Sequence, residues 1–221
     1  MIDLKDIWRE HKMRYFIGLL LTVVLAWSTV GYTTKPDFYS SLITKIGVIH
    51  SLDNRIIQYA NVNYCNKTVS VTAAHVVKVM PEYSPNSILI IEDDKFDIAI
   101  YELLGPSDVS PLATKLPSPF EIVYIPTYYW VEKVNVVYQS PIVGYLEHRT
   151  LVQYLGFFGM SGSGAYNSKG EYIGPAIRMF TAPGFDIEGL PGMSVEQQVG
   201  IIGIGRTDRL IEMFTKEVCG K

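Results

Sequence analysis

Three polar side chains, far apart in a largely apolar part of the chain, could together activate a hydroxyl group. Ser161 lies in the glycine-rich segment GMSGSG, which spans 159–164. His75 ends the segment TAAH, and Asp97 directly precedes the apolar run IAI. A serine hydroxyl becomes a nucleophile when a histidine takes its proton and a carboxylate orients that histidine. These residue types therefore predict an acyl-transfer site, provided that the fold brings them together.

The glycines around Ser161 suit a sharp turn that exposes the serine hydroxyl. Glycine permits positive φ and close backbone approach, so amide groups can converge on one point. We expect the amides of Gly159 and Ser161 to form an oxyanion hole, which stabilises the charge that develops on a carbonyl oxygen. Ser163 is a rival nucleophile, but only Ser161 has glycine two residues before it and one after it. By itself, such a segment also fits an ordinary tight turn.

In their chain order, the three motifs resemble those of the chymotrypsin-like serine proteases. TAAH matches the histidine motif of that family, DIAI resembles its aspartate motif, and GMSGSG resembles its nucleophile motif GxSGG or GxSGS. The resemblance covers about 43–214 and is closer to compact bacterial and viral members, such as HtrA-type proteases, glutamyl endopeptidases and viral processing proteases, than to trypsin. It implies that Ser161 attacks a peptide carbonyl, His75 transfers the proton and Asp97 orients the imidazole.

Two details bear on these assignments. Asp93 and Asp94 are rivals for the role of Asp97, but only Asp97 stands directly before the apolar run. Met160 occupies the position where trypsin-like zymogens carry an aspartate that pairs with a newly cut N-terminus. The resemblance therefore implies an enzyme that does not need a trimmed N-terminus.

The resemblance also implies a pocket for the substrate side chain that precedes the scissile bond. Its residues are mostly apolar and predict a neutral, apolar or small substrate residue, although an inward-pointing arginine would favour an acidic one. No cofactor is needed, and no spacing typical of metal ligands is present. The implied pocket residues are Leu155, Ile177, Arg178, Met179, Ile202 and Ile204.

Composition indicates a folded domain rich in strands. The chain has 221 residues, of which 48% are hydrophobic and 19% charged, and its 15 tyrosines accompany many valines and isoleucines. These residue types favour strands. The net charge is −3, without a basic block, which argues against nucleic acid as the main partner. Cys65 and Cys219 lie at opposite ends of the domain, so we expect two free thiols.

The expected fold class is all-β, with one helix near the C-terminal end. The resemblance implies two six-stranded antiparallel Greek-key barrels, the first at about 43–112 and the second at about 119–206. Proline and glycine in 181–194 predict a mobile loop. Apolar residues at helical spacing predict a helix at about 208–218, with Thr207 or Asp208 as its N-cap.

The N-terminal part of the chain predicts a membrane anchor. The leader, 1–14, is polar, whereas 15–32 contains no charged residue and approaches the length of about 17–25 residues that a spanning helix needs. A cleaved signal peptide is the alternative, with a small-residue cleavage site at 26–28. The positive excess of the leader predicts a cytoplasmic N-terminus and a translocated protease domain at 43–221, joined by a linker at 33–42. Cleavage would leave that domain secreted or periplasmic.

The sequence thus predicts a membrane-anchored serine endopeptidase that forms an acyl-enzyme intermediate on a protein or peptide substrate. Two other classes stay open. One is a catalytically inactive relative that binds peptides in the same cleft, and the other is a structural membrane protein whose barrels serve assembly. Within the enzyme class, both a viral polyprotein-processing protease and a bacterial envelope protease fit the residues.

Overall fold

The computed structural model describes residues 36–50, 55–78, 87–146, 149–154, 156, 159–186 and 194–220. The chain divides into two units, Met1–Tyr39 and Ser40–Lys221, and the second contains all the strands that the structure describes. The segment predicted to cross a membrane, 15–32, lies outside the described residues. Of the helices that are described, none has the length and apolar character that crossing a bilayer requires.

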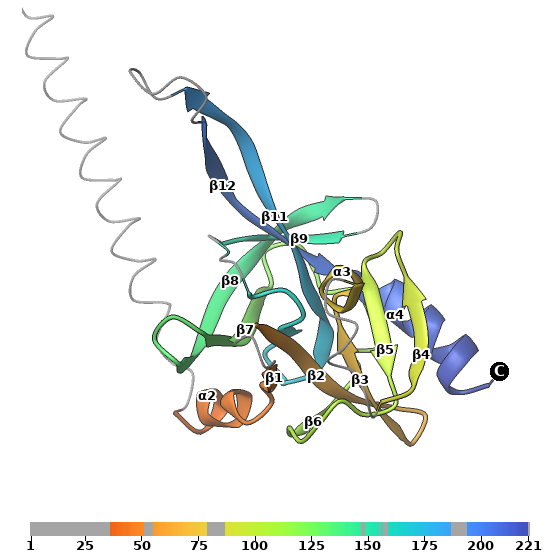
Figure 1. Cartoon of the computed structure of the whole chain (residues 1–221). Helices are drawn as coiled ribbons and strands as arrows, with labels where there is room; N and C mark the ends of the chain where they lie inside the picture. Colours follow the sequence, from red (N-terminus) through yellow and green to blue (C-terminus); the bar gives the residue numbers. More distant parts are fainter. Residues whose placement is uncertain are drawn as a thin grey trace, which may run out of the picture. The chain divides into compact units, whose positions relative to one another are not determined.

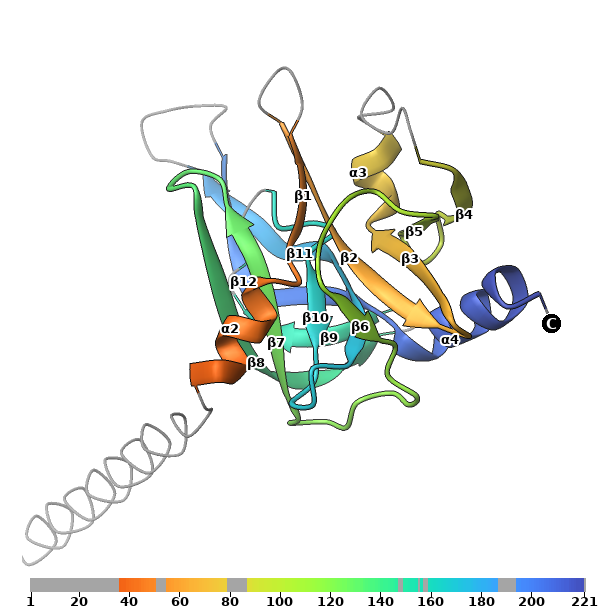
Figure 2. The ribbon, with the colours of Figure 1, turned by 90° about the horizontal axis from the view of Figure 1, so that it is seen from below.

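The first six strands of the second unit form one sheet. Its order is β1-β2-β3-β5-β4, and β6 pairs with β2 in parallel. Among the described residues this sheet is open, because the short edge strands β1 and β4 do not pair with each other (Figure 2). The prediction of a closed, wholly antiparallel first barrel is therefore wrong. The strands are β1 (Gly47–His50), β2 (Ile56–Tyr64), β3 (Lys67–Thr72), β4 (Leu89–Asp93), β5 (Ile98–Tyr101) and β6 (Val109–Pro111).

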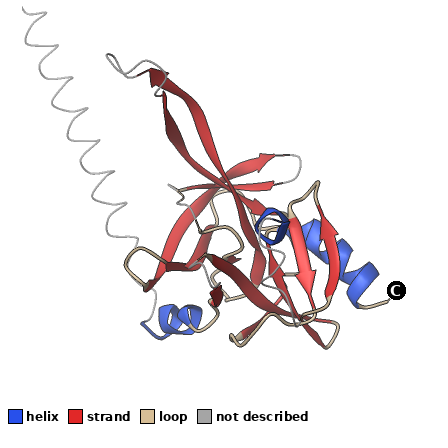
Figure 3. Cartoon of the chain, viewed as in Figure 1, coloured by secondary structure: helices blue, strands red, loops and turns tan. Residues whose placement is uncertain are grey.

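The last six strands close into a barrel, which confirms the second predicted barrel. Its order is β10-β11-β12-β9-β8-β7, and neighbouring strands are antiparallel. Strands dominate this unit, as the red ribbons of Figure 3 show. The strands are β7 (Ile122–Tyr129), β8 (Val134–Leu146), β9 (Arg149–Gln153), β10 (Gly164–Tyr166), β11 (Tyr172–Asp186) and β12 (Ser194–Gly205).

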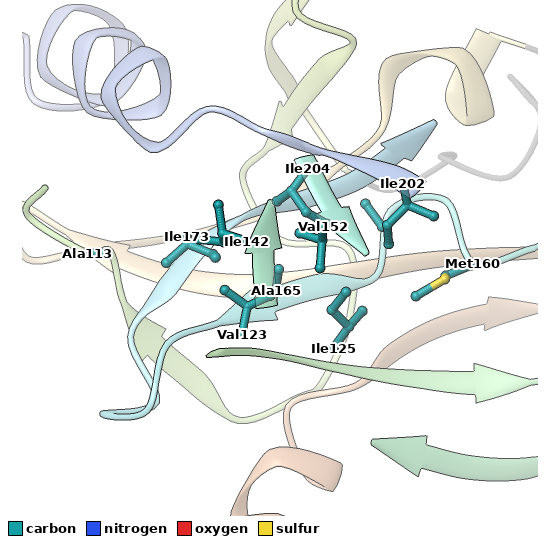
Figure 4. Packing of buried hydrophobic residues seen from close by; sticks show 11 residues of the cluster. Ala113, Val123, Ile125, Ile142, Val152, Met160, Ala165, Ile173, Ile202 and Ile204 are labelled. Carbon is teal, nitrogen blue, oxygen red and sulfur yellow. The ribbon is translucent and has the colours of Figure 1, made fainter. Parts of the chain in front are cut away.

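The barrel encloses an apolar core (Figure 4). Fully burying one branched aliphatic side chain contributes about 1.5–3 kcal/mol, so this cluster is a main source of stability. One member, Met160, belongs to the glycine-rich segment rather than to a strand. The buried members are Ala113, Val123, Ile125, Ile142, Val152, Met160, Ala165, Ile173, Ala176, Ile202 and Ile204.

Strands β11 and β12 continue beyond the barrel as a two-stranded ribbon (Figure 1). They occupy 181–186 and 194, which is half of the mobile loop that proline and glycine predicted for 181–194, and the rest of that loop, 187–193, lies outside the described residues. Pairing extends to Asp186 and Ser194 because the register shifts between Ala182 and Phe185, where Pro183 and Gly184 lie. Such irregularities allow proline and glycine within a strand.

Two short helices occupy segments for which no helix was predicted. Helix α2 (Pro36–Ile43) replaces most of the expected linker. Proline suits its first position, where the missing N–H has no intrahelical partner. Helix α3 (Ala74–Lys78) follows β3 and carries His75.

The C-terminal helix is confirmed. Helix α4 (Thr207–Met213) continues into the π-helical segment η2 (Phe214–Val218). The predicted cap is wrong, because Arg206 occupies the N-cap without a side-chain capping bond. The hydroxyl of Thr207 instead donates to the carbonyl of Ile173 at 2.7 Å, which fixes the helix to the barrel.

Cys65 and Cys219 form a disulfide, so the expectation of free thiols is wrong. Their Cα atoms are 5.8 Å apart although the residues are separated by 154 positions. The β2–β3 turn and η2 meet here, since the rings of Tyr64 and Phe214 pack edge to face with centroids 5.7 Å apart. The disulfide joins segments that are far apart in the chain, so no local sequence pattern predicts it.

Candidate active site

His75 and Asp97 contact each other through two hydrogen bonds, one from the His75 ring and one from the His75 backbone, both to the Asp97 carboxylate. His75 Nδ1 lies 2.7 Å from Asp97 Oδ2, and the backbone amide of His75 donates to Asp97 Oδ1 at 2.8 Å. The imidazole is half exposed, with 49% of its side-chain surface accessible, against 18% for the carboxylate. The pair therefore joins a shielded carboxylate to a ring that solvent or a ligand can reach.

Asp97 has a special backbone conformation in the turn between β4 and β5. Its φ is 57°, in the left-handed region, where a non-glycine residue costs of order 1–3 kcal/mol although aspartate is better tolerated than most. Its carbonyl accepts the amide of Ala74 at 3.2 Å, in addition to the two bonds with His75. These contacts hold the carboxylate at the start of α3.

The rival carboxylates have other partners. Asp93 Oδ2 lies 2.8 Å from the guanidinium of Arg209, and its Oδ1 accepts the amide of Phe96. Asp94 pairs with Lys78 at 2.5 Å, and the hydrogen bond from that ammonium lowers the pKa of the Asp94 carboxyl. Only Asp97 contacts the histidine, as the position before the apolar run suggested.

Ser161 lies in a turn that is anchored on both sides. The amide of Ser163 donates to the carbonyl of Met160 at 3.0 Å, and the amide of Gly162 donates to Ala176 at 2.8 Å. The side chain of Met160 is only 3% exposed and packs into the barrel core. An apolar anchor thus occupies the position where trypsin-like zymogens have an aspartate.

Gly162 brings this turn against the first sheet. A β-carbon at Gly162 would lie 2.1 Å from the carbonyl oxygen of Gln58 and 2.3 Å from Thr72 Oγ1. Its φ of 88° also requires glycine. Thr72 is the first residue of TAAH, so the turn that bears Ser161 abuts the strand that leads to His75.

The rival serine is buried. Ser163 is 2% exposed, and its hydroxyl lies 2.9 Å from Gln58 Oε1 and 2.8 Å from Thr127 Oγ1. Ser161, in contrast, is half buried. In the described part of the chain no hydrogen bond joins its hydroxyl to His75. Catalytic hydrogen bonds are often long in ligand-free enzymes and shorten when substrate binds.

The backbone conformation of Gly159 is compatible with the oxyanion hole that is expected from the amides of Gly159 and Ser161. Gly159 has a φ of 92°, a conformation that lets its amide turn toward that of Ser161. Within the described residues, neither amide donates a hydrogen bond to a protein acceptor.

The implied pocket residues divide into three groups. Ile177 packs with Ile57, Ala73 and Val76 between the sheets. The side chains of Ile202 and Ile204 point into the barrel core (Figure 4). Leu155, and the side chains of Arg178 and Met179, lie outside the described residues.

Sequence reasoning missed Gln58, whose side-chain amide contacts the glycine-rich turn. Its Nε2 donates to the carbonyl of Gly159 at 2.6 Å, although the two residues are far apart in the chain. A glutamine within the apolar run IIQYA was the available signal, because a polar side chain at a core position of a strand must find partners.

No protein-family model matches the sequence, and no curated protein matches it either. Solved structures do match by fold. An inactive serine-to-alanine mutant of Rv3671c from Mycobacterium tuberculosis H37Rv superposes with a TM-score of 0.51 at 12% identity, over 83% of this chain and 91% of that one.

Two further structures match similarly. The serine endoprotease from Yersinia pestis has a TM-score of 0.54 at 16% identity, over 82% of this chain and 67% of its own. The MamO protease domain from Magnetospirillum magneticum has a TM-score of 0.54 at 14% identity, over 79% and 97%. The predicted resemblance is thereby confirmed at the level of fold, which is that of the chymotrypsin-like serine proteases.

Proposed function

We propose that this chain is a serine endopeptidase in which Ser161, His75 and Asp97 form the catalytic triad. The hydrogen bond between His75 Nδ1 and Asp97 Oδ2, 2.7 Å long, carries the proposal. It occurs in a protease fold and beside a glycine-rich turn that leaves one serine half exposed. Of the two serines in that turn, the buried Ser163 already has partners.

The geometry supports the following mechanism. Because Nδ1 of His75 donates to Asp97, Nε2 is the basic nitrogen and takes the proton from Ser161 Oγ. Oγ then bonds to the peptide carbonyl carbon, and the amides of Gly159 and Ser161 stabilise the oxyanion. The imidazolium protonates the leaving amine as the C–N bond breaks. Water, deprotonated by His75, hydrolyses the acyl-enzyme and restores the serine.

The proposed enzyme is held at a membrane by residues 15–32, with its N-terminus in the cytoplasm. The absence of charge from this run supports the anchor. Fractionation of cells that express the full chain tests it: we expect the protein in membranes after a carbonate wash. Recovery of a shortened protein in the soluble fraction would show a cleaved signal peptide instead.

Labelling of the full-length protein, purified in detergent, with a fluorophosphonate probe tests the catalytic proposal. We expect the wild-type chain to label and the Ser161→Ala and His75→Ala variants not to label. Ser168→Ala is the matched control, since it removes an exposed hydroxyl from another turn and should label normally. A folded wild-type chain that neither labels nor cleaves peptides would exclude the enzyme and favour the peptide-binding alternative.

A further inference from the structure

The side-chain amide of Gln58 joins the first sheet to the barrel formed by β7–β12. Gln58 is 1% exposed and is the third residue of β2. Its Nε2 donates to the carbonyls of Gly159, at 2.6 Å, and Tyr128, at 3.1 Å. Its Oε1 accepts from the amide of Tyr128 and the hydroxyl of Thr127, and lies 2.9 Å from Ser163 Oγ. Every partner belongs to β7 or to the glycine-rich segment.

These partners allow only one orientation of the amide. The backbone N–H of Tyr128 can only donate, so the atom facing it must be the oxygen of Gln58. The carbonyls of Gly159 and Tyr128 can only accept, so both hydrogens of Nε2 are used. Rotating the amide by half a turn would place oxygen against two carbonyl oxygens. The side-chain amide of Gln58 therefore holds the first sheet and the barrel together in one fixed orientation.

The carbonyl of Gly159 needs such a contact. Glycine has access to both signs of φ, so its conformation must be fixed by its neighbours. The carbonyl of Gly159 and the amide nitrogen of Met160 belong to one peptide unit. The hydrogen bond from Gln58 holds the carbonyl of this unit, and the side chain of Met160 is packed in the barrel core. The two contacts together fix the peptide unit that lies between the one bearing the Gly159 amide and the one bearing the Ser161 amide.

We infer that Gln58 is a positioning residue: it fixes the peptide unit between Gly159 and Met160 and so sets the orientation of the two proposed oxyanion donors relative to each other, a role that rests on the proposed function. Gln58 does not touch the reacting atoms. Its loss leaves the substrate-binding surface in place but lets the peptide unit between Gly159 and Met160 rotate. Loss of Gln58 should weaken the stabilisation of the transition state, in which charge develops on the carbonyl oxygen. It should therefore lower kcat and leave KM nearly unchanged.

Asn61 supplies a matched control on the same strand. It is also a buried amide, 2% exposed. Its Nδ2 donates to the carbonyls of Gly105 and Ser107, and its Oδ1 accepts the hydroxyl of Ser70 at 2.6 Å. None of these partners belongs to the glycine-rich segment. Asn61→Ala thus removes a buried amide network of similar size at a distance from the proposed site.

The experiment compares wild type, Gln58→Ala and Asn61→Ala as full-length proteins in detergent, below the unfolding temperature of each. The rate of fluorophosphonate labelling and the kcat and KM for a peptide substrate are measured per folded molecule. Loss of one oxyanion donor lowers kcat by about 10²–10³-fold, so we expect Gln58→Ala to lose about 10–100-fold in kcat and labelling rate, with KM nearly unchanged. Asn61→Ala should stay within about threefold of wild type.

Equal losses in the two variants, or wild-type rates in Gln58→Ala, would overturn the inference while leaving the proposed function intact. A wild-type chain that does not label would instead remove the proposed function, and this role with it. If Gln58→Ala does not fold, Gln58→Met provides the same comparison with Asn61→Leu. Methionine keeps the length and approximate volume of glutamine but has no N–H group to donate to Gly159.

Discussion

Asp97 binds His75 at both the ring and the backbone: Oδ2 lies 2.7 Å from Nδ1, and Oδ1 accepts the His75 amide at 2.8 Å. A carboxylate held in this way fixes the ring relative to the first turn of α3. It also selects the tautomer in which Nδ1 carries the proton and Nε2 is basic. The orientation of the proposed base is therefore determined by a turn that follows it by 22 positions.

Asp97→Asn tests this relationship. The amide of asparagine can still accept the His75 backbone N–H, but its nitrogen donates to Nδ1 and shifts the ring proton to Nε2. We expect kcat for peptide hydrolysis to fall by about 10⁴-fold with little change in fold. Asp94→Asn is the control, because that carboxylate binds only surface groups, and it should retain activity. Retention of activity in Asp97→Asn would remove Asp97 from the triad.

Gly162→Ala tests the close approach of the glycine-rich turn to β2. The added methyl group would lie 2.1 Å from the Gln58 carbonyl, at a φ of 88°. Backbone strain and overpacking together should lower the free energy of unfolding by about 3 kcal/mol or more. Gly144→Ala, where the new methyl group meets nothing within 4 Å, should change it by less than about 1 kcal/mol. Equal unfolding midpoints in urea for the two variants would contradict this packing.

The sequence identified two of the residues whose types the proposed chemistry requires, a histidine and a carboxylate. TAAH and DIAI place a histidine and a carboxylate at the ends of buried strands, and the structure brings His75 and Asp97 together. Local signals also predicted the C-terminal helix, because its apolar residues repeat at helical spacing. These features depend on a few neighbouring residues, so one sequence is sufficient to predict them.

Apart from the two short helices and the helix cap, which are local features, the failures involve tertiary contacts. Nothing near Cys65 indicates that Cys219 lies beside it, and nothing near Gln58 indicates the carbonyl of Gly159. The strand ribbon at 181–186 contains proline and glycine, and only its pairing with β12 overrides their turn preference.

The disulfide should stabilise the unit measurably. It closes a segment of 154 positions, and in the chain-entropy view such a crosslink destabilises the unfolded state, with typical effects of about 2–5 kcal/mol. We expect dithiothreitol to lower the unfolding temperature of the wild-type protein. The double variant Cys65→Ser, Cys219→Ser should already unfold at the lower temperature and should not respond to the reductant. An identical response of both proteins would exclude this role for the disulfide.

Arg209 connects the C-terminal helix to the turn that holds Asp97. Its guanidinium lies 2.8 Å from Asp93 Oδ2 and 4.7 Å from the ring centroid of Phe96. Asp93 in turn accepts the amide of Phe96, the residue that directly precedes Asp97. Helix α4 thus supports the conformation that presents the proposed catalytic carboxylate, without touching His75.

Arg209→Ala should therefore affect both stability and catalysis. Losing a partly buried ion pair leaves Asp93 without its cation and should cost about 1 kcal/mol or more of unfolding free energy. The loosened turn should lower kcat about 3–10-fold, a loss of about 0.7–1.4 kcal/mol in transition-state stabilisation. Lys216→Ala is the control, since Lys216 is 77% exposed and pairs only with Glu217. A loss of stability with unchanged kcat would show that Asp97 keeps its position without α4, through its bonds to Ala74 and His75 alone.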